Sequence, residues 1–157
     1  MDYGKSLIYH LLPELFKIES NTTPVVIVVS LLNIIQKDQL ATLATHNIPT
    51  CRYNIKTKTD EASEGGPVYE VDSGVGLDTV INGQFQIVLC HPEALLNTKD
   101  SQNLLDNDSF RNHVVAVVIH ECHLLEKWGE EFRKAFEKLD SLNVFFPNIL
   151  FAALSGT

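Results

Sequence analysis

HVVAVVIHECH, residues 113–123, is the stretch that decides the fold. Residues 114–119 are all apolar and mostly β-branched, which is typical of a strand that is covered on both faces. This strand runs directly into four titratable side chains: His120, Glu121, Cys122 and His123. In parallel sheets flanked by helices, ligands bind beyond the carboxyl ends of the strands. The stretch therefore predicts a buried parallel strand with a functional site at its end.

The same pattern recurs along the chain. Strands are predicted at residues 24–29, 50–55, 85–90 and 148–154, and helices at residues 5–18, 33–46 and about 130–141. A short helical region is predicted around residues 93–111. Strands that alternate with helices imply an α/β fold, a mainly parallel sheet of about five strands between helices. Residues 56–84 interrupt this alternation with glycines and acidic side chains. We expect a solvated loop or insertion there, within a single domain spanning residues 1–157.

Composition limits the kind of partner and the compartment. The formal net charge of -8 argues against nonspecific binding of polyanions, which depends on Lys and Arg. Three cysteines without a close pair indicate reduced thiols in an intracellular protein, nuclear or cytoplasmic. The sequence contains neither a long apolar run nor a signal sequence, so we expect no contact with a membrane.

A phosphate-binding signal opens the first predicted helix with Gly4, Lys5 and Ser6. In a phosphate-binding loop, backbone N–H groups and the Lys contact phosphate, and the Ser holds Mg²⁺. The full loop has a glycine further upstream, at a position that would precede Met1, and Asp2 would repel phosphate. By itself the three-residue match is a weak signal.

Five segments, taken in order, resemble superfamily 2 helicases and within them the RecQ family of DNA helicases. They are GKS (4–6), VVS with KDQ (28–30 and 37–39), HPEAL (91–95), HECH with the trailing KWGEEFR (120–133) and AALSGT (152–157). The resemblance covers the chain from Tyr3 to Thr157 apart from residues 56–84. It implies a RecA-like phosphate-loop NTPase domain, the N-terminal ATP-binding domain of an ATP-dependent 3'-to-5' DNA helicase.

The resemblance also implies roles for single residues. Gly4, Lys5 and Ser6 would bind ATP, and Ser6 with Glu121 would hold Mg²⁺. Glu121 would be the catalytic base, and His123 would relay between the ATP and DNA sites. The remaining implied roles are contacts with single-stranded or duplex DNA, by Ser30, Trp128, Phe132 and Arg133, and coupling of ATP to DNA, by Ser155 and Thr157.

Several departures from the family fall on the chemistry. His120 stands where the family has Asp, and imidazole is a poor substitute for the oxygen ligands of Mg²⁺. Leu31 replaces a proline and Ala94 replaces an arginine. The first, phosphate-loop strand and the second RecA-like domain are missing from this sequence. We therefore expect that this chain alone does not unwind DNA.

Two explanations remain open: a truncated portion of a longer helicase, or a short degenerate paralogue, which the substitutions favour. The alternative function is a non-catalytic, helicase-like protein-interaction module. Without the phosphate-loop strand, the strand at 148–154 would have an open edge, which predicts self-association or low solubility.

Two further alternatives concern single residues. Trp128 and Phe132 are also compatible with a packed pair at a helix start. Zinc binding by His120, Cys122 and His123, with Cys90 and His91, is disfavoured, because successive strand residues point to opposite faces.

Overall fold

The computed structural model describes residues 4–17, 21–30, 32–58, 68–123, 134 and 137–156. Its sheet has six strands in the order β3-β2-β4-β1-β5-β6. The strands are β1 (Val25–Ser30), β2 (Thr50–Lys58), β3 (Val68–Asp72), β4 (Ile87–Cys90), β5 (Val114–His120) and β6 (Leu150–Leu154). Five of them pair in parallel, and β3 pairs antiparallel with the outer part of β2. The predicted α/β fold with a mainly parallel sheet is confirmed.

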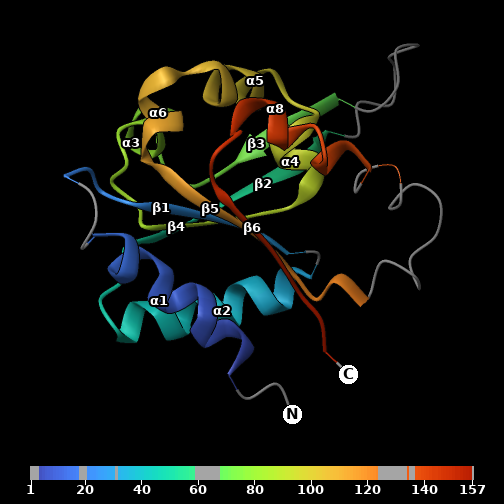
Figure 1. The fold of residues 1–157 in the computed structure, drawn as a ribbon. Helices are drawn as coiled ribbons and strands as arrows, with labels where there is room; N and C mark the ends of the chain where they lie inside the picture. The colour runs from blue at the N-terminus through green and yellow to red at the C-terminus, as the bar shows by residue number, and fades with distance from the viewer. Residues whose placement is uncertain are drawn as a thin grey trace.

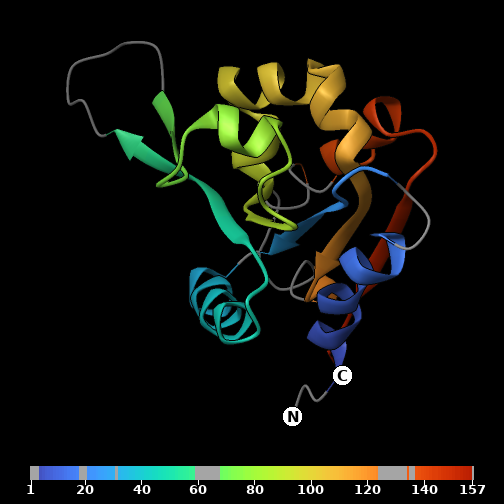
Figure 2. The same ribbon diagram turned by 90° about the vertical axis from the view of Figure 1, so that its left-hand side faces the viewer.

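Helices cover both faces of this sheet (Figure 1). On one face lie α1 (Lys5–Lys17) and α2 (Asn33–Thr45). The other face carries α3 (Leu77–Ile81), α4 (Pro92–Leu96), α5 (Lys99–Asp106), α6 (Asp108–His113) and α8 (Leu142–Phe145). The quarter-turn view in Figure 2 shows the same three layers. Helices that pack on both faces explain why β1 and β4 are buried along their whole length.

Each face of the sheet has its own apolar core. Tyr9 of α1 and Leu43 of α2 pack on the side chains of β1 and β5 that point to their face. Phe110 and Leu142 pack on the opposite face with the alternate residues of the same strands. None of the described helices is long and apolar enough to cross a membrane.

The structure corrects one expectation about local structure. Residues 56–84, expected to form a loop or insertion, contain the end of β2, all of β3 and the helix α3. The cross-strand pairing of Asn54–Lys58 with Val68–Asp72 outweighs the loop-like composition. The short helical region predicted around 93–111 is confirmed, and it consists of α4, α5 and α6, with Thr98 capping α5 and Asn107 capping α6. In the helix expected at about 130–141, residues 134 and 137–139 are helical, and 130–133, 135 and 136 lie outside the described residues.

Candidate functional site

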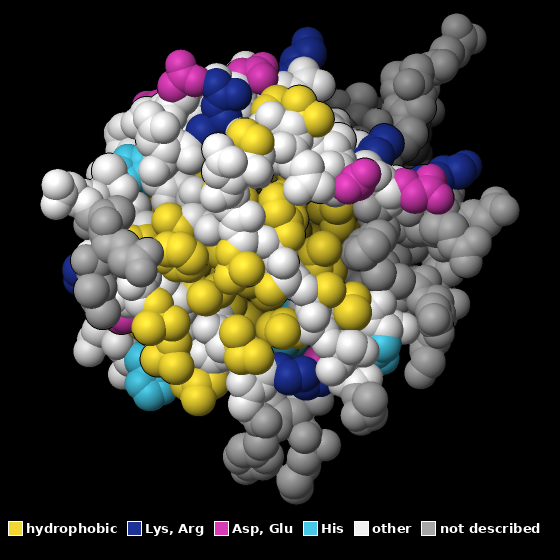
Figure 3. Space-filling model, viewed as in Figure 1, with side chains coloured by type: hydrophobic (Ala, Val, Ile, Leu, Met, Phe, Trp, Pro, Cys, Tyr) yellow, Lys and Arg dark blue, Asp and Glu magenta, His cyan; other side chains and the backbone are white. Residues whose placement is uncertain are grey.

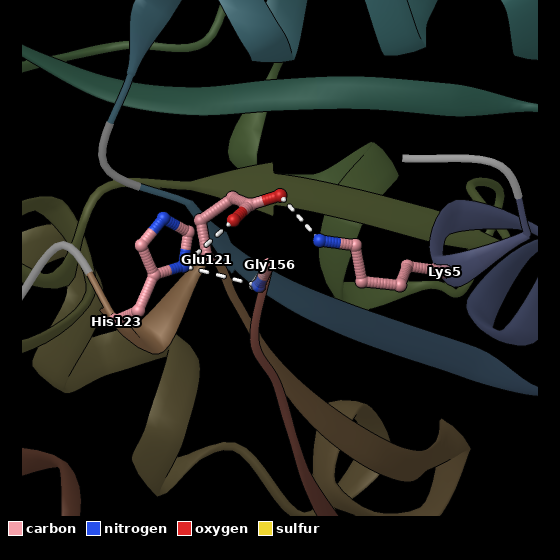
Figure 4. Close-up of polar contacts among 4 residues, drawn as sticks. All are labelled: Lys5, Glu121, His123 and Gly156. Atoms are coloured by element: carbon pink, nitrogen blue, oxygen red, sulfur yellow. Dashed lines mark hydrogen bonds and ion pairs between the residues drawn. The ribbon is translucent and has the colours of Figure 1, made fainter. Parts of the chain in front are cut away.

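Four residues from three separate segments meet at the carboxyl edge of the sheet (Figure 4). Lys5 lies at the start of α1, Glu121 and His123 follow β5, and Gly156 follows β6. The Nζ of Lys5 is 3.3 Å from Oε1 of Glu121, and Nδ1 of His123 is 3.0 Å from Oε2 of Glu121. The backbone N–H of Gly156 completes the series, 3.1 Å from Nδ1 of His123. These residues form what we call the Lys5–Gly156 relay.

A strained turn places the carboxylate at the centre of the relay. Glu121 has φ of 60°, a left-handed conformation that non-glycine residues rarely adopt. Such a residue costs about 1–3 kcal/mol and persists where its surroundings hold it in place. Only 5% of Glu121 is exposed, so its charge needs the Lys5 ammonium and the His123 imidazole nearby. The turn thus aims a buried carboxylate between two nitrogen groups.

The Nδ1 atom of His123 has two partners but can satisfy only one at a time. A neutral ring nitrogen that accepts the Gly156 N–H has no proton for Glu121. A protonated Nδ1 donates to Glu121 and leaves the Gly156 N–H without this acceptor. The two contacts of Nδ1 therefore describe alternative states. The position of one proton decides whether the end of β6 or the carboxylate is bonded to the ring.

Gly156 is a site residue that sequence reasoning missed. A β-carbon there would lie 2.6 Å from Nζ of Lys5, 3.0 Å from Oε2 of Glu121 and 3.1 Å from Cε1 of His123. Any larger residue would therefore require these relay side chains to shift. The signal in the sequence was the glycine of Ser-Gly-Thr, which lies next to the predicted coupling residue Ser155. Ser155 itself is exposed.

His120 faces α1, where its ring packs edge-on against Tyr9 with centroids 5.5 Å apart. Only 5% of His120 is exposed. Burial raises the pKa of the Tyr9 hydroxyl, and the negative charges of Glu121 and then Asp38 raise it further. His120 therefore belongs to an aromatic contact beneath the relay.

The donor set does not suit Mg²⁺. Mg²⁺ prefers several oxygen ligands in octahedral geometry, whereas the last residue of β5 offers an imidazole, that of His120. Both carboxylate oxygens of Glu121 already lie beside nitrogen groups. Within the described ranges, no group of three or more His, Cys, Asp or Glu side chains gathers as a metal site. The structure thus favours neither the Mg²⁺ pair Ser6 and Glu121 nor the zinc alternative.

A cavity of about 630 Å³ adjoins the relay between α1 and α2. Its lining combines the start of α1, one face of α2 and the end of β5: Gly4, Ser6, Ile34, Ile35, Asp38, Gln39, Thr42, His120 and Glu121. Gly4 has φ of 105°, a backbone conformation that favours glycine. The predicted nucleotide residues Gly4 and Ser6 therefore line a cavity large enough for a small molecule.

The predicted nucleic-acid and coupling residues are not brought together in the described part of the chain. Ser30 lies at the end of β1 and is 2% exposed, so its hydroxyl does not reach the surface. Trp128, Phe132, Arg133 and Thr157, like Asp2, lie outside the described residues.

No protein-family model matches the chain, but the curated relatives that match it are ATP-dependent helicases. The mouse (Mus musculus) bifunctional 3'-5' exonuclease/ATP-dependent helicase WRN is 26% identical over 155 residues, 99% of this chain and 9% of WRN. The ATP-dependent helicase SGS1 of Saccharomyces cerevisiae is 24% identical over 98% of this chain and 10% of SGS1. The ATP-dependent DNA helicase Q-like 4B of Arabidopsis thaliana is 27% identical over 98% of this chain and 12% of that helicase.

The chain is RecQ-like. The predicted resemblance to RecQ helicases is confirmed, and it extends over almost the whole sequence. The RecQ-like chain spans about a tenth of the length of these curated relatives. The segments that carry the relay are thus the counterpart of a small part of a much longer helicase.

Proposed function

We propose that the chain is the ATP-binding domain of a RecQ-like, ATP-dependent 3'-to-5' DNA helicase. The observation that carries this proposal is the Lys5–Gly156 relay, which connects the start of α1 to the ends of β5 and β6. A helix N-terminus with a lysine suits phosphate, and α1 begins with Lys5 and Ser6 beside the cavity. The relatives described as ATP-dependent helicases support the same assignment.

ATP binding would act on the relay through Lys5. A phosphate next to α1 would compete with Glu121 for the Lys5 ammonium. Glu121 could then bond more strongly to a protonated His123, and the Gly156 N–H would be released. In this way the state of the nucleotide site would reach Ser155 and Thr157 at the end of β6.

The isolated chain is proposed to bind ATP without hydrolysing it. Glu121 is retained as the proposed base, but its surroundings do not suit Mg²⁺, as described above. We therefore expect Mg²⁺ to add little to ATP affinity and the chain alone to unwind no DNA. DNA contact by Trp128, Phe132 and Arg133 is proposed only in the setting of a whole helicase.

Calorimetric titration with a nonhydrolysable ATP analogue, with and without Mg²⁺, tests the proposal. We expect saturable binding that Lys5→Met weakens and Lys17→Met leaves unchanged, because Lys17 lies at the far end of α1. Absence of binding at millimolar analogue, or equal binding by both variants, would refute the nucleotide assignment.

A protein-interaction module is the second candidate, favoured by the apolar surface over β6 and α1 (Figure 3). Leu7, Leu11 and Leu15 of α1 are 54%, 49% and 59% exposed, and Leu150 of β6 is 43% exposed. Strand β6 is also the edge of the sheet. Light scattering of concentrated protein tests self-association, with Leu11→Glu expected to reduce it.

The matched control is Val144→Glu, because Val144 is 80% exposed but lies on α8. A monodisperse monomer at high concentration would contradict self-association through this surface.

A further inference from the structure

A buried hydroxyl group lies one helical turn from Lys5, and sequence reasoning did not select it. Tyr9 follows Lys5 by four residues in α1, so the two side chains share a face of the helix. Tyr9 is 0% exposed, and its hydroxyl has no hydrogen-bond partner among the described residues. Buried polar groups are normally hydrogen-bonded, because an unmade bond costs free energy. The Tyr9 hydroxyl is therefore an exception next to the Lys5–Gly156 relay.

The surroundings of Tyr9 connect it to the relay carboxylate. Its ring packs edge-on against His120, the residue that directly precedes Glu121. His120 and Glu121 both line the cavity beside α1. Two carboxylates raise the pKa of Tyr9 beyond the effect of burial, and Glu121 raises it more than Asp38 does. Tyr9 therefore keeps its proton near pH 7, and it can approach a carboxylate only as a donor.

The carboxylate of Glu121 depends on Lys5 at one of its two oxygens. Oε2 lies beside Nδ1 of His123, whereas Oε1 lies beside Nζ of Lys5 (Figure 4). Glu121 is 5% exposed, so water cannot readily replace a partner that leaves. A buried carboxylate oxygen without a partner is costly. Movement of Lys5 away from Oε1 thus requires a second donor on the same side of the carboxylate.

We propose that Tyr9 is a positioning residue that donates a hydrogen bond to Oε1 of Glu121 when Lys5 leaves this oxygen. Lys5 and Tyr9 come from the same face of α1, so they alternate as partners of one buried carboxylate. Glu121 then stays in place while the ammonium moves. In the ATP-bound protein this role rests on the proposed function, because a phosphate draws Lys5 away. The exchange itself does not, because any loss of the Lys5 ammonium triggers it.

The proposal predicts that the effect of Tyr9→Phe depends on Lys5. In the wild type the hydroxyl is unpartnered, so Tyr9→Phe should leave the urea midpoint unchanged or raise it. In the Lys5→Met background the hydroxyl bonds to Glu121, and Tyr9→Phe should lower the midpoint. A structural role of the ring alone would give the same change in both backgrounds, and that result overturns the proposal.

The matched control is Tyr53→Phe. Tyr53 is 1% exposed, its hydroxyl also has no hydrogen-bond partner among the described residues, and it belongs to the core on the opposite face of the sheet. We expect Tyr53→Phe to change the midpoint equally in the wild type and in Lys5→Met. A dependence on Lys5 as large as that of Tyr9→Phe would overturn the proposal.

NMR of protein labelled with ¹³C at the tyrosine Cζ atoms gives a direct readout without ligand. The chain has four tyrosines, and Tyr9→Phe assigns the resonance of Tyr9. We expect this resonance to shift in Lys5→Met and a slowly exchanging hydroxyl proton to appear with it. Lys17→Met, at the other end of α1, should change neither. Absence of the protected hydroxyl proton in folded Lys5→Met overturns the proposal.

Titration with the nonhydrolysable ATP analogue extends the test to wild-type protein, should Lys5→Met fail to fold. Tyr9→Phe should weaken analogue binding about 5-fold, the equivalent of one hydrogen bond, and Tyr53→Phe should not. Unchanged affinity in Tyr9→Phe would overturn the role of Tyr9. Absence of analogue binding by the wild type would refute the proposed function instead, and the ligand-free comparison of Lys5→Met with Lys17→Met would still decide the role of Tyr9.

Discussion

Removing the Lys5 ammonium tests the centre of the relay. Lys5→Met keeps a long unbranched side chain but removes the charge that lies 3.3 Å from Glu121. The side chains of Lys5 and Glu121 are 20% and 7% exposed, so solvent screens this pair poorly. The same helix provides a control in Lys17, which pairs with Glu14 at 3.8 Å, with side chains 60% and 64% exposed.

The two pairs should differ clearly in energy. A hydrogen bond to a charged group contributes about 1.5–3 kcal/mol, and removing one partner leaves the other charge buried. The free energy lost in Lys5→Met should lie near the lower end of this range, because His123 still lies beside the Glu121 carboxylate. We expect Lys5→Met to lower the free energy of unfolding by about 2 kcal/mol, which corresponds to a Tm lower by about 4–8 °C. Lys17→Met should change it by less than about 0.5 kcal/mol.

Urea unfolding followed by circular dichroism measures both variants, with an unchanged m value as the check that the denatured states are comparable. A double-mutant cycle with Glu121→Gln isolates the pair, and we expect a coupling energy of about 1–2 kcal/mol. Equal losses for Lys5→Met and Lys17→Met, or a coupling energy near zero, would show that the ion pair does not stabilise the fold.

Three further predictions follow from burial and close packing. Gly156→Ala should lower Tm by several degrees, because its β-carbon would lie 2.6 Å from the ammonium nitrogen of Lys5. The control Gly76→Ala should leave Tm unchanged, because a β-carbon at Gly76 meets no atom within 4 Å. Equal melting curves for the two variants would contradict the close approach. Burial lowers the pKa of His10 from 6.5, so the folded protein binds fewer protons there than the unfolded chain. The contribution of His10 to stability is full above pH 6.5 and is lost as the pH falls. In His10→Gln, the urea midpoint should therefore depend less on pH between pH 7.5 and 5 than in the wild type. An unchanged pH dependence in this variant would contradict the role of His10. Cys122 is partly exposed and should react first with a thiol reagent. Burial raises the pKa of Cys51 to about 12, so Cys51 should react only when the protein unfolds. Simultaneous labelling of the two thiols would contradict this prediction.

The elements that sequence reasoning located best are the buried strands. Continuous β-branched runs such as VVIVV and VVAVVI can bury their apolar side chains on both faces only when helices cover both sides of the sheet. The bounds of β1 and β5 were therefore predictable to within a residue or two. The hairpin of β2 and β3 was missed because its composition is that of a loop, and only pairing across the two strands makes it regular.

The candidate site divides in a similar way. Lys5, Glu121 and His123 were predicted by their motifs, and the fold brings all three together. Ser30 was predicted to contact nucleic acid, but the packing of β1 buries its hydroxyl. Arg52 and His91 lie 39 positions apart in the sequence, and although His91 opens the HPEAL segment, nothing local indicated that the two side chains share Oδ1 of Asn33 as an acceptor.

The sequence by itself determined the alternation of strands and helices, the strand end that carries Glu121, and the resemblance to RecQ helicases. These depend on local periodicity and on motifs, which are properties of neighbouring residues. Only the tertiary structure decided that the Gly156 N–H reaches His123, that Lys5 faces Glu121, and that Tyr9 packs against His120. Those facts depend on the order in which strands pair, because parallel pairing brings strand ends that are distant in sequence to the same edge of the sheet.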